Sequence, residues 1–155
     1  MNINSESDDK SIFNTSPVVG WLGYGGLLPF VALSAAVWFD ENHRNLWHNA
    51  LINYGAMILS FVGALHWGLA MSQMELTSHQ RNRSFVWSIV PALVAWVALM
   101  LLPNYAIGLL VAGFWLHFLQ DRRLVQITNL PRWYLPLRLR LTMVASASLL
   151  LTYFS

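Results

Sequence analysis

Long apolar runs separated by short polar segments dominate the chain. The pattern predicts five helices, over residues 18–39, 47–71, 85–102, 105–120 and 137–154. A helix needs about 20 apolar residues to cross roughly 30 Å of hydrocarbon, and the first three runs meet this requirement. The last two runs are shorter, and the fifth needs Arg138 and Arg140 to extend toward the interface. Strands are not expected, because the runs lack the alternation of a membrane barrel.

The polar breaks divide the chain into a tail and one membrane domain. Residues 1–17 are polar and acidic, and we expect them to be disordered. Residues 85–119 as one helix would be on the order of 50 Å long, too long for a bilayer. Pro103 and Asn104 interrupt this stretch with a strong turn signal. The five helices therefore form one domain over residues 18–155.

The composition makes a soluble domain untenable. The 155 residues are 56% hydrophobic and only 10% charged, against about 25% charged in ordinary soluble domains. Cysteine is absent, which excludes a disulfide scaffold. The sequence therefore predicts an all-α, polytopic integral membrane protein.

The basic residues are divided unequally between the two sides of the predicted topology. Eight of the nine Lys and Arg residues fall in the tail and in the segments after helices two and four, and only Arg44 falls on the other side. Basic residues are enriched on the cytoplasmic side of membranes. We therefore expect the N-terminus inside, the C-terminus outside, and a location in the bacterial inner (cytoplasmic) membrane.

The chain carries no recognisable catalytic motif. It lacks a P-loop, a GxGxxG loop, an HExxH helix and a cysteine pair, so we expect no enzymatic activity and no metal site. None of the seven carboxylates falls inside a predicted helix. Because proton-coupled transporters usually need an intramembrane acid, a small transporter is a weaker alternative.

Two histidines fall inside the predicted membrane helices. His66 and His117 lie on helices that run in the same direction, each about 5–8 Å below the inner boundary, so the two imidazoles can face each other. They are the candidate cofactor-binding residues, because imidazole can ligate haem or hydrogen-bond a quinone head group. The alternative is that they hold helices together through polar contacts. The sequence leaves both open.

The segment after the fourth run is basic and aromatic. Because guanidinium groups bind lipid phosphates and aromatic rings sit at headgroup depth, we expect contacts with anionic headgroups or with a membrane-protein partner, and no nucleic acid. The contact residues are Arg122, Arg123, Arg132, Trp133, Tyr134, Arg138 and Arg140.

Three strings carry a family resemblance. They are LGYGGLLPF at 22–30, YGAMILSFVGALHWGLA at 54–70 and LPRWYLPLRLRLT at 130–142. They resemble an uncharacterised family of small membrane proteins, domain of unknown function 3429, whose animal members are called transmembrane protein 69. The resemblance implies a five-helix protein of bacterial inner membranes with relatives in mitochondria, and it brings no activity or catalytic residue. The matched positions most worth testing are His66, Trp67, Trp133, Tyr134 and Arg138.

These observations favour a non-enzymatic accessory or structural membrane protein. It would act through lipid or membrane-protein contacts at its inner face. The alternative from another class is a redox-associated protein that binds quinone or haem through His66 and His117.

Overall fold

The computed structural model describes residues 17–72, 77–128 and 130–154, and all regular structure in these ranges is helical. The expectation of an all-α protein is confirmed. The tail expected to be disordered lies outside the described residues, apart from Pro17. The elements are α2 (Pro17–Gly25), α3 (Leu28–Phe39), the 3-10 turn η1 (Glu41–His43), α4 (Arg44–Ser72), α5 (Ser78–Ala98), α6 (Pro103–Ile127) and α7 (Tyr134–Leu151).

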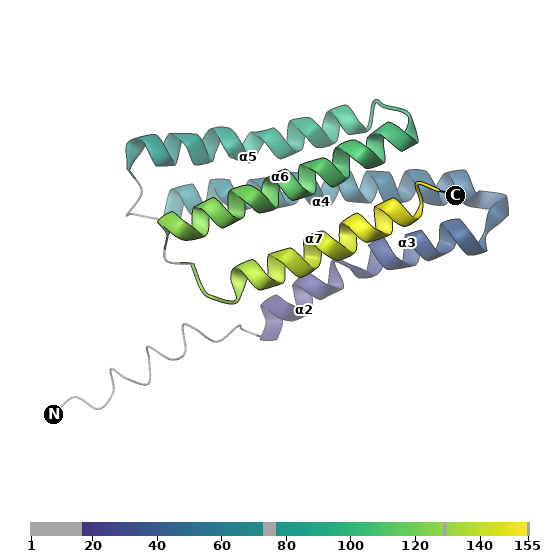
Figure 1. Ribbon diagram of the computed structural model, residues 1–155, viewed down its shortest axis with the longest axis horizontal. Helices are drawn as coiled ribbons and strands as arrows, with labels where there is room; N and C mark the ends of the chain where they lie inside the picture. The colour runs from purple at the N-terminus through teal and green to yellow at the C-terminus, as the bar shows by residue number, and fades with distance from the viewer. Residues whose placement is uncertain (1–16, 73–76, 129, 155) are drawn as a thin grey trace.

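The long helices lie side by side as an antiparallel bundle (Figure 1). The helix α4 is central, because it contacts α3, α5, α6 and α7. Buried side chains of Leu51, Leu59, Ile107, Leu110 and Leu149 form part of one core shared by α4, α6 and α7. The end of α4, the start of α5, the end of α6 and the start of α7 meet at one end of the bundle.

The first predicted helix is interrupted. Residues 18–39 divide into α2 and α3 at Gly26 and Leu27, where the amide of Leu27 donates to the carbonyl of Tyr24. Pro29 explains the break, because its nitrogen cannot donate to the carbonyl four residues earlier and its ring collides with that carbonyl. The break turns α2 out of line with α3.

Several helices extend further than their apolar runs. The helix α5 begins at Ser78 rather than 85. Thr77, the residue just before the helix, and Gln80 in its first turn form a reciprocal capping box that stabilises this start. The helix α6 continues to Ile127, seven residues beyond its predicted end at 120. Polar residues that the hydrophobic pattern assigns to a loop therefore lie on helices.

Three described segments are long and apolar enough to cross a membrane. They are Gly20–Phe39, Glu41–Ser72 and Tyr134–Leu151. The helices α5 and α6 are also long, at 21 and 25 residues, but arginines lie within both of them. The fold thus supports membrane insertion.

Asp40 organises the turn between α3 and α4. Its carboxylate accepts the indole N–H of Trp47 at 3.0 Å and the backbone N–H of His43 at 3.3 Å. These bonds fix η1 and the first turns of α4 relative to the end of α3. The Trp47 hydrogen bond lowers the pKa of the Asp40 carboxyl below its ordinary value.

Two glycines let α4 approach its neighbours closely. A Cβ atom on Gly63 would lie 2.8 Å from the carbonyl oxygen of Ser88 and 3.0 Å from Pro91, so α4 and α5 touch there with no room for a side chain. A Cβ atom on Gly113 would lie 2.7 Å from a methyl group of Leu59, where α6 meets α4. Small residues at helix contacts permit this approach in membranes.

The close contact predicts a difference between two glycines of α4. Gly63→Ala should lower the free energy of unfolding by about 1–3 kcal/mol, because it overpacks the contact with α5. Gly68→Ala is the matched control, since nothing lies within 4 Å of its added Cβ, and it should be neutral or stabilising by up to about 1 kcal/mol. Reversible unfolding in mixed detergent micelles measures both. Equal stabilities of the two variants would contradict the packing described.

Candidate functional site

A carboxylate that the sequence pattern assigns to a loop is buried inside the bundle, near the end where α6 meets α7. Asp121 is on α6 and is 0% exposed. The expectation that no carboxylate lies in a helix is therefore wrong. The predicted helix 105–120 ends one residue before Asp121, whereas α6 continues to Ile127 and Asp121 lies on its buried face. The objection to a transporter that rested on this expectation no longer applies.

Two side chains of α7 hold the Asp121 carboxylate. The Nε of Arg138 donates to Oδ2 at 2.8 Å, and the hydroxyl of Tyr134 donates to Oδ1 at 3.1 Å. The side chain of Arg138 is only 8% exposed, so the ion pair is almost fully withdrawn from solvent. Arg138 was expected to contact lipid headgroups, and the structure places it inside the bundle instead.

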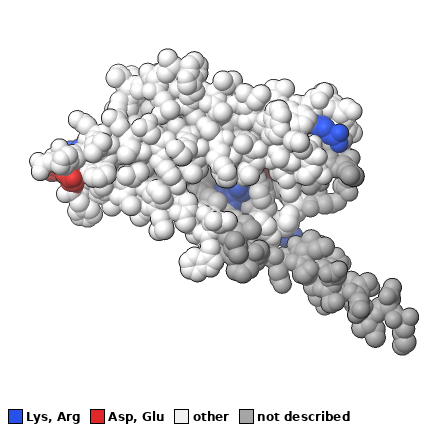
Figure 2. Space-filling view, turned by 180° about the vertical axis from the view of Figure 1, so that it is seen from behind, with Lys and Arg blue, Asp and Glu red and all other residues white. Residues whose placement is uncertain are grey.

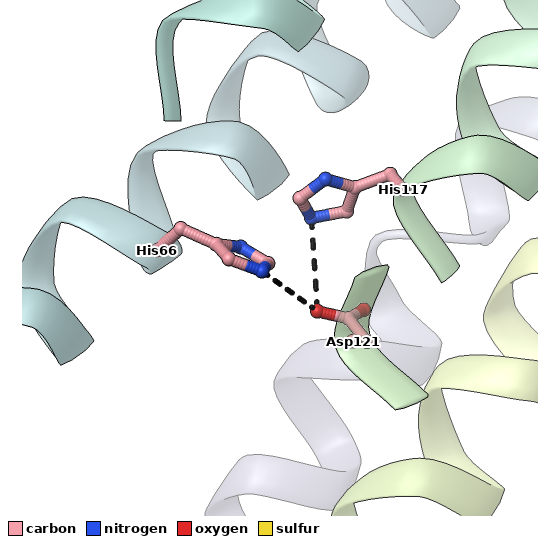
Figure 3. Close-up of side chains that lie close together, drawn as sticks. All are labelled: His66, His117 and Asp121. Atoms are coloured by element: carbon pink, nitrogen blue, oxygen red, sulfur yellow. Dashed lines mark ion pairs between the residues drawn. The ribbon is translucent and has the colours of Figure 1, made fainter. Parts of the chain in front are cut away.

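The two predicted histidines lie beside the same carboxylate. The ring centroids of His66 and His117 are 4.6 Å apart in an edge-to-face arrangement. The Nε2 of His66 is 3.5 Å from Oδ1 of Asp121, and the Nε2 of His117 is 3.8 Å from it (Figure 3). Gly113, about one turn before His117, lets α6 lie close to α4 at Leu59, near where the two rings meet.

Trp87 of α5 sets the chemical form of His117. Its indole nitrogen donates to Nδ1 of His117 at 3.3 Å. An indole N–H can only donate, so Nδ1 must carry a lone pair and neutral His117 must carry its proton on Nε2. The cluster therefore joins four helices: α4 through His66, α5 through Trp87, α6 through His117 and Asp121, and α7 through two further residues.

A haem held between the two histidines does not fit this geometry. An iron about 2 Å from each nitrogen would hold the two ring centres about 6 Å apart, on opposite faces of a macrocycle. The rings of His66 and His117 are in direct contact instead. The two histidine rings therefore pack against each other and leave no room for a haem between them.

A metal ion fits the cluster poorly as well. One ligand atom each from His66, His117 and Asp121 lie within 4.8 Å of one another. However, a metal-bound histidine usually donates its second ring N–H to an acceptor, and His117 meets a donor, Trp87, at that position. The guanidinium of Arg138 also adds a positive charge at the same carboxylate. The arrangement suits a hydrogen-bonding polar cluster better than a metal centre.

The remaining predicted contact residues lie nearer the surface. Arg122, Arg123, Arg132 and Arg140 are exposed, and Arg140 donates to the hydroxyl of Tyr24 at 3.2 Å. Trp133 is half-buried. The seven predicted residues therefore comprise four exposed arginines, the half-buried Trp133, and two residues that bond to Asp121: the half-buried Tyr134 and the buried Arg138.

Sequence reasoning missed Asp121 and Trp87. A signal for Asp121 was available, because His117, Asp121 and Leu124 follow the i, i+4, i+7 spacing of one helix face. That spacing continues the buried face of α6 beyond the apolar run. Trp87 has no such signal, since its partner depends on how α5 packs against α6.

The ion pair predicts strong coupling between its two residues. Asp121→Asn or Arg138→Gln alone should lower the free energy of unfolding by about 3–5 kcal/mol, because each leaves a buried charge unpaired. The double variant Asp121→Leu with Arg138→Leu should be much closer to wild type than the sum of the single effects. Unfolding in mixed micelles measures this, and Arg140→Gln is the exposed control. Additive single effects would argue against a buried pair.

Comparisons with known proteins agree with the membrane character of the chain. Residues 15–154 match the family described as protein of unknown function (DUF3429). Transmembrane protein 69 of Xenopus tropicalis is 32% identical over 152 residues, covering 92% of this chain and 56% of that protein. Transmembrane protein 69 of Mus musculus is 25% identical over 134 residues, covering 85% and 54%.

The chain thus spans about half the length of these relatives. No solved structure matches it. The match to the family covers nearly the whole described bundle, including every residue of the polar cluster. The chain therefore belongs to the DUF3429 family of membrane proteins of unknown function.

Proposed function

We propose that the protein is a non-enzymatic accessory protein of the bacterial inner membrane that acts through lipid contacts at its inner face. The observation that carries the proposal is the sorting of charge between the two ends of the bundle. One end holds seven arginines of the described chain: Arg81, Arg83, Arg122, Arg123, Arg132, Arg138 and Arg140. The opposite end holds Arg44 together with Asp40 and Glu41.

This sorting supports five spans with the N-terminus inside. The five long helical segments, with α2 and α3 counted as one, alternate in direction through the bundle. A basic end of this kind is typical of the cytoplasmic side. An odd number of spans then puts the C-terminal end of α7 outside.

The exposed arginines are suited to anionic headgroups. Arg83, Arg122, Arg123 and Arg132 form no ion pair within the described ranges. Each basic residue near an anionic leaflet contributes about 1 kcal/mol of attraction. Asp121, the acid nearest to these residues along α6, is already bonded to Arg138, so lipid phosphates are the natural partners at this face.

A transporter is less well supported than the accessory role. Asp121 supplies the buried acid that such a function needs. Its charge is balanced by Arg138 at 2.8 Å, which suits a fixed structural pair better than a group that gains and loses protons.

The proposed topology predicts where fused reporters work. A reporter active only in the cytoplasm should work at the N-terminus and when inserted between 126 and 131, and it should fail after Ser155. Reporter activity in cells, with expression measured in parallel, checks this. Activity of the C-terminal fusion would mean an even number of spans and would refute the five-span proposal.

The proposed lipid contact predicts a dependence on anionic lipid. In nanodiscs, replacing phosphatidylcholine by phosphatidylglycerol should raise the melting temperature of the wild type. The triple variant Arg122→Gln, Arg123→Gln, Arg132→Gln should lose most of this increase, because its headgroup partners are removed. Arg44→Gln at the opposite end is the control and should retain it. If the triple variant kept the whole increase, the inner-face contact would not be the relevant one.

A further inference from the structure

A cavity of about 470 Å³ lies between the α2–α3 break and the helices α4, α6 and α7. Its size is within the range of about 300–1,000 Å³ typical of sites for small ligands. The α2–α3 break lies at one wall of the cavity, which Gly23, Gly26 and Leu27 help to line. Most of the other lining residues are apolar, among them Phe30, Ile58, Phe61, Leu65, Phe114 and Leu141.

One charged group faces this apolar space. Among the described residues that line the cavity, Arg138 alone is charged, and Tyr134 and Thr142 add hydroxyl groups. Figure 2 shows blue atoms within a hollow near the middle of a largely white face, whereas other blue and red atoms lie toward the ends. The cavity therefore has a polar end where α7 meets the Asp121 cluster.

The guanidinium of Arg138 is only partly used by the protein. Its Nε bonds to Asp121, but its Nη2 is buried and has no hydrogen-bond partner among the described residues. The residue is 7% exposed. A buried donor without a partner is unfavourable by about 1–3 kcal/mol or more, so the guanidinium of Arg138, which lines the cavity, has donor capacity that the protein leaves unused.

The charge balance of the site selects the kind of acceptor. Asp121 already neutralises Arg138, so the pair offers donors without offering net positive charge. An anionic head would be placed close to the Asp121 carboxylate and would be repelled by it. A neutral carbonyl oxygen accepts the same hydrogen bond without this repulsion, and its apolar tail matches the walls.

We propose that this cavity binds one lipophilic molecule with a neutral carbonyl head, which accepts a hydrogen bond from the guanidinium of Arg138. Two membrane molecules share this chemistry: an isoprenoid quinone and an acylglycerol. The site is separate from the exposed arginines of the inner face, so either proposal can fail without the other. His66 and His117 are not among the residues that line the cavity, so they would not contact the head directly.

Native mass spectrometry of the detergent-solubilised protein tests the proposal. The probes are decylubiquinone, monoolein and oleate, each titrated against the full chain. We expect one molecule of a neutral probe to bind at least tenfold more tightly than oleate. Binding of decylubiquinone identifies a quinone site, and binding of monoolein identifies an acylglycerol site. Binding of neither, or tighter binding of oleate, would overturn the proposal.

Matched variants locate the binding. Leu141→Trp fills the cavity and should weaken binding at least tenfold. The control is Leu139→Trp, because Leu139 is on the same helix and is also half-buried but does not line the cavity. The affinity of Leu139→Trp for the neutral probe should stay within about twofold of wild type. The double variant Asp121→Leu with Arg138→Leu removes the donor without leaving a lone charge, and it should abolish the preference for carbonyl heads. Equal binding by both Trp variants, or an unchanged preference in the folded double variant, would show that the probe binds elsewhere.

Discussion

The buried bond between Asp121 and Arg138 is the interaction on which the rest of the structure depends. Withdrawing either charge from water alone would be unfavourable by several kcal/mol, so each residue requires the other. The 2.8 Å contact fixes the start of α7 against the end of α6. Tyr134 and the two histidines complete the surroundings of the carboxylate, and through them the pair extends to α4. The polar cluster around Asp121 therefore holds the helices of the bundle together, and the packed helices in turn keep the cluster away from solvent.

Backbone proximity is what allows the cluster to form. Gly63 and Gly113 bring α5 and α6 against α4 about one turn before the histidines. The Trp87 indole N–H then donates to Nδ1 of His117, so the proton of the neutral His117 ring lies on Nε2, the nitrogen that faces Asp121. The α2–α3 break lies at the wall of the cavity that Arg138 also lines. A polar cluster next to an apolar cavity gives this membrane protein a place where a lipophilic molecule can be held by its head.

Much of the fold could be predicted from the sequence, because apolar runs and turn residues are local signals. The helical class, the turn at Pro103 and the approach of His66 to His117 all followed from run lengths and helix register. The Pro29 break was not predicted, because a kink in a membrane helix depends on whether neighbouring helices satisfy the freed carbonyls. Asp121 and Arg138 were misplaced for a related reason. A charged residue near the end of an apolar run can extend to the interface or pair inside, and only its partner on another helix decides between the two.

The bond between Asp121 and Arg138 can be measured directly in lipid. Solid-state NMR with ¹⁵N-labelled arginine and ¹³C-labelled aspartate reports the dipolar coupling between the Arg138 Nε and the Asp121 carboxyl carbon. The Nε–Oδ2 distance of 2.8 Å predicts a measurable coupling across the hydrogen bond that disappears in Asp121→Asn protein made with the same labels. A wild-type spectrum without this coupling would contradict the account, because the two charges would then not be paired inside the bundle.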